Sequence, residues 1–129
     1  MGRLLPAGTV VRDQLDFYSP PNSTVRVPGV MVGTLDVKIF LNGSILPWTV
    51  ADGTSIPDSA LSAGTVLFNE IIGAPGFYSS RFFPDRIGYW RLVVYQSSSG
   101  NEQIRDYDIV PAGTFSPSSQ GGVTASFTK

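Results

Sequence analysis

The chain of 129 residues contains no cysteine and no histidine. It therefore cannot build a Ser-His-Asp or Cys-His nucleophile system, an imidazole general base, or a metal site with His or Cys ligands. A glycosidase would need two carboxylates facing each other across a cleft, and the ten acidic residues are instead spread over the whole chain. The sequence therefore predicts that the protein is not an enzyme. No disulfide can form, so the fold must depend on its core or on neighbouring molecules.

A strong charge of one sign and long apolar runs are also missing. The net charge is −1 and the nine basic residues form no run, so we expect neither a nucleic-acid partner nor an acidic membrane as a partner. No stretch approaches the roughly 18 apolar residues that a membrane span needs. The segment 1–6 is too short in apolar length for a signal peptide, and we expect the mature chain to begin at or near Met1.

Calcium is the remaining metal to consider, because loop carboxylates and carbonyls can bind it. The best cluster is 52–55 together with Asp58, and the second is the pair Asp106 and Asp108, two residues apart on one predicted strand. Neither cluster has the dense alternating acids of a dedicated calcium loop. We interpret the first as a turn and the second as the solvent side of a strand, and predict no metal and no cofactor.

An apolar period of two runs through most of the chain and predicts half-buried β-strands. The clearest case is 34–42, which ends in Asn42-Gly43, a pair that favours a tight hairpin turn. Further strands are expected at 9–18, 44–50, 65–72, 77–83, 89–95 and 103–110. One short helical turn is plausible at 58–61. With 14 Gly and 10 Pro scattered between these runs, the pattern predicts an all-β sandwich of about seven to eight strands.

The alternation also selects the residues of the core. The inward positions of the central strands are expected to be Leu35, Val37, Ile39, Tyr78, Phe82, Trp90, Leu92 and Val94.

The stretch 69–95 carries a series of structural motifs. It contains Glu70-Ile71 at a strand end, Gly76-Phe77-Tyr78, a corner at Phe82-Phe83-Pro84, and Gly88-Tyr89-Trp90 followed by alternating apolar residues. This stretch, with the hairpin 36–43 before it, resembles the immunoglobulin-like domains of virion proteins from tailed bacteriophages. The resemblance covers roughly 34–110.

The resemblance implies an immunoglobulin-like β-sandwich that acts as a non-catalytic structural or attachment module of a virion. Its partners would be other virion proteins and copies of itself. We lean toward a place in the tail or baseplate over decoration of the capsid.

Three regions follow from this interpretation. The segment 1–30 would be an N-terminal arm with the first strand, 31–110 the sandwich, and 111–129 a C-terminal arm. We expect neighbouring subunits to hold both arms, the alternative being that the arms add edge strands to their own domain. The residues expected at the interfaces are Val10, Val11, Phe40, Trp48, Phe115, Val123 and Phe127.

A second hypothesis is a glycan-binding adhesion module. Such a module would use outward-facing aromatic side chains, and the alternation places Phe40, Trp48, Tyr89 and Tyr95 on outer faces. The same four side chains would suit a protein interface equally well.

Overall fold

The computed structural model describes residues 3–19, 24–97 and 99–112, and these residues form nine strands and two short 3-10 turns. The strands are β1 (Arg3–Pro6), β2 (Val11–Asp16), β3 (Leu35–Leu41), β4 (Ser44–Leu46), β5 (Thr49–Asp52), β6 (Thr65–Glu70), β7 (Phe77–Phe82), β8 (Gly88–Gln96) and β9 (Asn101–Val110). The 3-10 turns are η1 (Val32–Thr34) and η2 (Asp58–Ala60), the second lying in the predicted segment 58–61. Among the described residues, no helix has the length and apolar character to cross a membrane.

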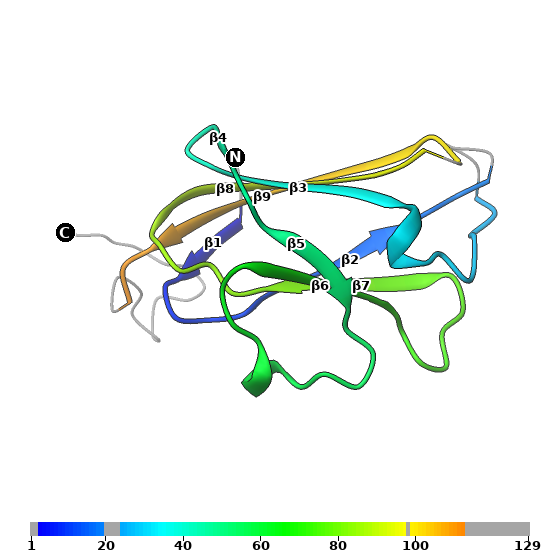
Figure 1. Cartoon of the computed structure of the whole chain (residues 1–129), viewed down its shortest axis with the longest axis horizontal. Coiled ribbons are helices and arrows are strands. Elements are labelled where there is room, and N and C mark those ends of the chain that lie inside the picture. Colours follow the sequence, from blue (N-terminus) through cyan, green and yellow to red (C-terminus); the bar gives the residue numbers. More distant parts are fainter. Residues whose placement is uncertain (1–2, 20–23, 98, 113–129) are drawn as a thin grey trace.

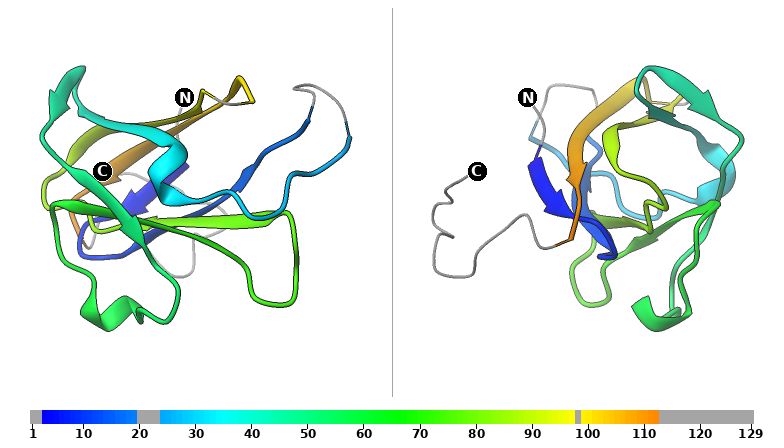
Figure 2. Two further views of the ribbon diagram at one scale, coloured as in Figure 1. Left: turned by 45° about the vertical axis from the view of Figure 1, so that its right-hand side comes forward. Right: turned by 90° about the vertical axis from the view of Figure 1, so that its left-hand side faces the viewer.

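Two sheets lie face to face (Figures 1 and 2). One has the strand order β1-β9-β8-β3-β4 and the other β2-β7-β6-β5. The pairs β1 with β9 and β5 with β6 are parallel, and the other pairs are antiparallel. The arrangement is that of immunoglobulin domains. In one sheet β3, β8 and β9 correspond to strands C, F and G, and in the other β2, β7 and β6 correspond to strands B, E and D. The prediction of an all-β, immunoglobulin-like sandwich is confirmed.

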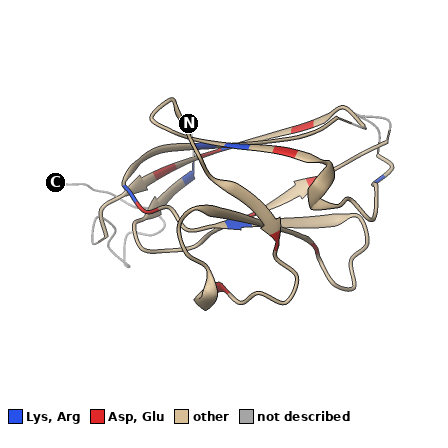
Figure 3. Cartoon of the chain, viewed as in Figure 1, with Lys and Arg blue, Asp and Glu red and all other residues tan. Residues whose placement is uncertain are grey.

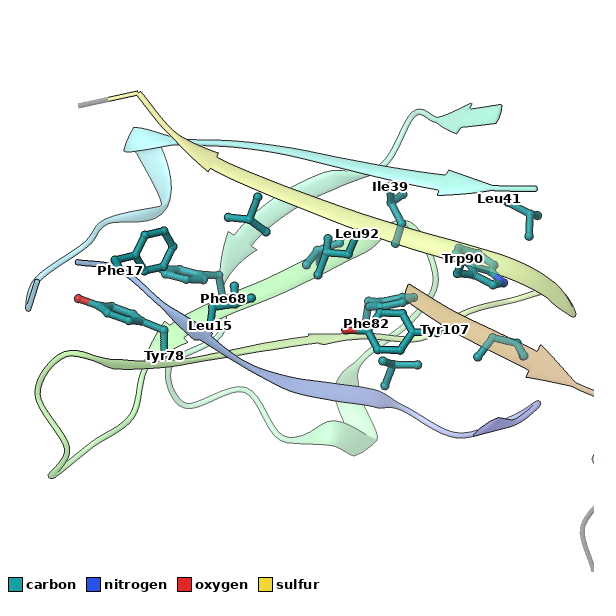
Figure 4. Close-up of a cluster of buried hydrophobic side chains, with 14 of the residues drawn as sticks. Leu15, Phe17, Ile39, Leu41, Phe68, Tyr78, Phe82, Trp90, Leu92 and Tyr107 are labelled. Atoms are coloured by element: carbon teal, nitrogen blue, oxygen red, sulfur yellow. The ribbon is translucent and has the colours of Figure 1, made fainter. Parts of the chain in front are cut away.

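The core lies between the sheets (Figure 4). Of the eight predicted core residues, six are buried, while Leu35 and Val37 are partly buried against the same cluster. Aromatic rings fill both ends of this layer. Phe17, Phe68 and Tyr78 pack at one end, with ring centroids 5.3–5.9 Å apart. At the other end Phe82 packs on Trp90 and Tyr107 at 5.8 and 5.6 Å.

Trp90 fixes the corner where β8 begins. Its indole Nε1 donates a hydrogen bond of 2.9 Å to the carbonyl of Arg86. Immunoglobulin domains usually place a tyrosine here, whose hydroxyl bonds to the backbone a few residues upstream and which stands two residues before a cysteine. In this chain the tryptophan supplies the bond, and the fully buried Leu92 stands where the cysteine would be.

The prediction of a single strand at 44–50 is wrong. This segment forms β4 and the first part of β5, which belong to different sheets. Proline has no N–H to donate to a ladder, so the strand breaks at Pro47 and the chain crosses from one sheet to the other. The crossing turns Trp48 inward, where its ring lies 5.4 Å from Trp90 and 6.1 Å from Phe82.

Residues 3–17 pack on their own domain, which is the alternative to the expectation that a neighbouring subunit holds this segment. Strand β1 pairs with β9, and β2 pairs with β7 over its full length. Val11 is 1% exposed and belongs to the core, so its prediction as an interface residue is wrong. The alternation that buries Leu15 and Phe17 also buries Val11, which lies four residues before Leu15 on the same face.

Candidate functional site

The outer face of the five-stranded sheet gathers apolar and aromatic side chains from β3, β4, β8 and β9. Since Trp90, Leu92 and Val94 face the core, the intervening residues of β8 face outward. The strand register places these residues beside outward residues of the neighbouring strands. We call this surface the tyrosine face, and it consists of Phe40, Ile45, Tyr89, Arg91, Val93, Tyr95, Ile104 and Asp106.

The register brings these side chains into continuous rows. Arg91 lies between Phe40 on β3 and Asp106 on β9, and Phe40 in turn lies beside Ile45 on β4. In the next row Val93 lies beside Ile104. The exposed fractions are 57% for Ile45, 45% for Ile104 and 38% for Tyr95, so much of this apolar surface remains in water.

The charges at the centre of the tyrosine face are paired with each other. Arg91 donates from Nε to Asp106 Oδ1 at 2.7 Å and from Nη2 to Asp106 Oδ2 at 3.1 Å, and a further bond of 3.0 Å reaches the Tyr89 hydroxyl. These hydrogen bonds from Arg91 lower the pKa of Asp106, and in return the pKa of Arg91 is raised. The pair stays ionised at neutral pH and adds no net charge to the surface.

Exposed charges surround this centre. Asp36 and Lys38 on β3 and Glu102 on β9 are exposed at the same outer face. Over the described residues as a whole, Lys and Arg are interspersed with Asp and Glu (Figure 3), without a region of one sign. The tyrosine face therefore differs from its surroundings in apolar content and not in net charge.

The predicted interface residues are divided by the structure. Phe40, half-buried, lies on the tyrosine face with Tyr89 and Tyr95. Trp48 packs against the core, so the expectation that it faces outward is wrong. Val10, directly before β2, is half-buried.

Phe115, Val123 and Phe127 lie outside the described residues. Ile45 and Ile104 were not among the predicted site residues. The alternation already set Ile104 against the inward Tyr107 and Ile109, and this was the signal that could have found it.

The acidic clusters are used in protein contacts. Asp52 accepts hydrogen bonds from the backbone and hydroxyl of Thr54, and Asp58 pairs with Arg12 and Arg81. Asp106 is held by Arg91. Within residues 3–19, 24–97 and 99–112, no group of three or more acidic, His or Cys side chains could hold a metal ion.

Comparison with known proteins finds little that bears on function. No family model and no curated protein matches the chain. Solved structures that match include a trigonal crystal form of the titin domain M4, at 17% identity and a TM-score of 0.39, with 86% of each chain covered.

Proposed function

We propose that the chain is a non-catalytic structural module of a virion of the tailed-bacteriophage type, which packs through its tyrosine face against neighbouring virion proteins. The resemblance of residues 34–110 to such domains supports the class of particle. The observation that carries the proposal is the apolar character of the tyrosine face. Ile45, Tyr95 and Ile104 are exposed there, and the charges of Arg91 and Asp106 are paired with each other. A place in the tail or baseplate is favoured over decoration of the capsid.

The composition of the tyrosine face suits an interface. Protein interfaces are enriched in aromatic residues and Arg at their core, with charged residues at the rim. Here Phe40 and Tyr89 flank Arg91, whose charge is already paired within the chain, and Tyr95 lies further along the same strand. A partner would therefore cover apolar surface without leaving an unpaired buried charge, which would be costly.

The proposal is tested on purified particles. Tailed particles would be isolated on a density gradient from a culture whose phage genome encodes the chain, and peptides of the chain would be quantified by mass spectrometry. We expect a constant ratio to the shell protein across the particle fractions. Absence of the peptides from intact particles would overturn the proposal.

Variants then test the surface. Ile104→Lys places a charge beside Val93 among the apolar side chains of the tyrosine face, where it would be buried on docking, and should reduce incorporation at least tenfold, which corresponds to about 1.4 kcal/mol. Glu102→Lys is the matched control because Glu102 lies two residues away on the same strand, at the rim. Equal incorporation of both variants would show that the tyrosine face is not the docking surface.

Glycan binding is the second candidate, since Tyr95 is 38% exposed and could stack on a sugar ring. The packing of the partly buried Trp48 against the core removes one of the aromatic residues on which that hypothesis depended. A glycan array probed with the purified chain and with Tyr95→Ala distinguishes the two functions. Binding by the unmodified chain, lost in the variant, would favour adhesion.

A further inference from the structure

The turn between β3 and β4 consists of two residues, Asn42 and Gly43. Their φ angles are both positive, 51° for Asn42 and 86° for Gly43, as a tight two-residue hairpin turn requires. Both residues are exposed, and β4 is the edge strand of its sheet. Water can therefore reach the peptide bond that joins the two residues.

The carboxamide of Asn42 is held by the neighbouring strand. Its Oδ1 accepts a hydrogen bond of 3.0 Å from the backbone N–H of Tyr89, whose carbonyl accepts a bond of 2.7 Å from the N–H of Asn42. A Cβ atom at Gly88 would come within 3.0 Å of both Oδ1 and Nδ2, so the carboxamide packs closely over this glycine. A donor at a carbonyl oxygen stabilises the negative charge that develops there during nucleophilic attack. The bond from Tyr89 therefore makes Cγ of Asn42 a better electrophile.

The backbone nitrogen of Gly43 is the nucleophile nearest in the chain to this carbon. Within the part of the chain that the structure describes, its N–H has no hydrogen-bond partner. Glycine has no Cβ to crowd an approach, and its backbone rotates more freely than that of any other residue. Attack by this nitrogen on Cγ of Asn42 would close a succinimide ring.

We propose that Asn42 is a modification site, at which the folded chain converts its own asparagine to aspartate and isoaspartate. The Gly43 nitrogen gives its proton to water and forms a bond to Cγ of Asn42. The bond from Cγ to Nδ2 breaks, and Nδ2 takes a proton from water and leaves as ammonia. Water then adds to one of the two carbonyl carbons of Asn42 in the ring. Addition at Cγ gives aspartate, and addition at the backbone carbonyl carbon gives isoaspartate, with no oxidation at any step.

The same ring could form at Asp52-Gly53, but there the contacts oppose it. The Gly53 N–H donates a hydrogen bond of 3.0 Å to the carbonyl of Phe68, so the nucleophile is occupied. The backbone and hydroxyl of Thr54 donate hydrogen bonds to Asp52 Oδ1, and these bonds lower the pKa of Asp52. Its side chain is therefore an ionised carboxylate at neutral pH, which resists nucleophilic attack. The structure thus distinguishes two pairs that the sequence makes look alike.

The two products would change the tyrosine face in different ways. Aspartate at position 42 keeps an oxygen that can accept the bond from Tyr89, and it adds a negative charge beside that residue. Isoaspartate lengthens the backbone of the turn. The pairing of β4 with β3 must then shift, and with it the position of Ile45 beside Phe40.

Incubation of the purified folded chain at neutral pH tests the proposal, with peptide mapping by mass spectrometry and enzymatic methylation to detect isoaspartate. Asn69 and Asn101 are internal controls, because each is followed by Glu and is less exposed than Asn42. We expect conversion at Asn42 to be at least about tenfold faster than at either control, a barrier lower by about 1.4 kcal/mol. Equal rates at the three asparagines, or isoaspartate at position 52 as abundant as at position 42, would overturn the proposal.

A second incubation tests whether the folded chain is the reacting form. Urea would be added at concentrations below and through the start of the unfolding transition. We expect the rate at Asn42 to stay constant while the unfolded fraction rises from near zero. A rate that increases in proportion to the unfolded fraction would overturn the proposal, because the reaction would then belong to the unfolded chain.

Two variants test the role of the Gly43 nitrogen. Gly43→Ala places a methyl group beside the nucleophile and should slow conversion at Asn42 about tenfold, which corresponds to about 1.4 kcal/mol. Gly73→Ala is the matched control, because Gly73 has a similar φ of 83° in another turn, and a Cβ at either glycine would meet no atom within 4 Å. Equal slowing by both variants would contradict a direct role for Gly43. The incubation uses the isolated chain, so its failure would leave the particle experiment unaffected.

Discussion

Trp90 connects the core to the corner before β8, because its ring lies in the core while its Nε1 donates a hydrogen bond of 2.9 Å to the Arg86 carbonyl. Trp90→Phe should lower the free energy of unfolding by about 2–4 kcal/mol, from the lost ring volume and the lost donor. Urea unfolding would measure it. Trp48→Phe is the matched control, since Trp48 is only partly buried against the same cluster. A loss for Trp48→Phe as large as that for Trp90→Phe would contradict the importance of the corner.

Asp58 connects the loop between β5 and β6 to the sheet through Arg81 and Arg12. The hydrogen bond from Arg81 is the main cause that lowers the pKa of Asp58. The carboxyl is therefore more acidic in the folded than in the unfolded chain. Its contribution to stability is fully present well above about pH 4, the usual pKa of an aspartate, and is lost as pH falls through the lower folded value.

The urea midpoint of the wild type should accordingly decrease between about pH 5 and pH 2.5. Asp58→Asn should be less stable at pH 7, because Arg81 then lacks its counter-ion in a buried position, and its midpoint should depend less on pH across that window. Asp106 and Asp16 also have lowered pKa values, so part of the acid dependence should remain in the variant. Identical slopes for the two proteins would show that the Asp58 pairs add nothing measurable.

At the scale of elements, a period of two predicted the strands that are flanked by clear turns. Strands β3, β6, β7, β8 and β9 were predicted to within a few residues, because alternation and Gly- or Pro-containing turns both act locally. Strand β1 was not predicted as a strand of its own, since Arg3–Pro6 has no alternation and is a strand only because the edge of β9 accepts it. The crossing at Pro47 was missed because the apolar residues around it continue the pattern.

The edge of β2 that does not pair with β7 is covered by side chains, which periodicity does not reveal. Side chains from the other sheet form hydrogen bonds with the backbone groups along this edge. Arg3 donates to the carbonyl of Arg12 and Arg105 to that of Gln14. Gln103 bonds to both backbone groups of Asp16. Asn101 does the same for Tyr18, with its Nδ2 donating to the carbonyl and its Oδ1 accepting from the N–H. An edge satisfied in this way is closed to pairing with another strand.

Asn101→Ala should open one end of this edge. Asn101 is 5% exposed, and its loss leaves both backbone groups of Tyr18 without that partner. We expect a loss of about 1–3 kcal/mol, together with faster hydrogen exchange at the amide of Tyr18 than elsewhere in the sheet. Native-state hydrogen exchange by NMR would measure both. Glu102→Ala, at the exposed neighbouring position, should change neither, and uniformly faster exchange would indicate general destabilisation instead.

At the scale of the whole molecule, the tyrosine face can be recognised only from the tertiary structure. The outward position of Tyr89 and Tyr95 follows from alternation alone. Their proximity to Phe40 and Ile104 depends on which strands are neighbours, and β3 and β8 are neighbours although β4, β5, β6 and β7 lie between them in the sequence. The position of the loop between β5 and β6 is set by Arg81, and sequence spacing gives no indication of that contact.

The two ends of the chain should differ in their effect on stability. Among the residues that the structure describes, the hydrophobic cluster extends from Leu5 to Ile109, and Val110 completes the pairing of β9 with β1. We expect removal of 111–129 to leave the melting temperature within about 2 °C of the wild type. Removal of 1–6 deletes β1 and with it the partly buried Leu5 and a parallel edge. This change should lower stability by about 2–4 kcal/mol. Calorimetry on both truncated chains decides the matter, because unfolding of the first would mean that the C-terminal segment belongs to the core.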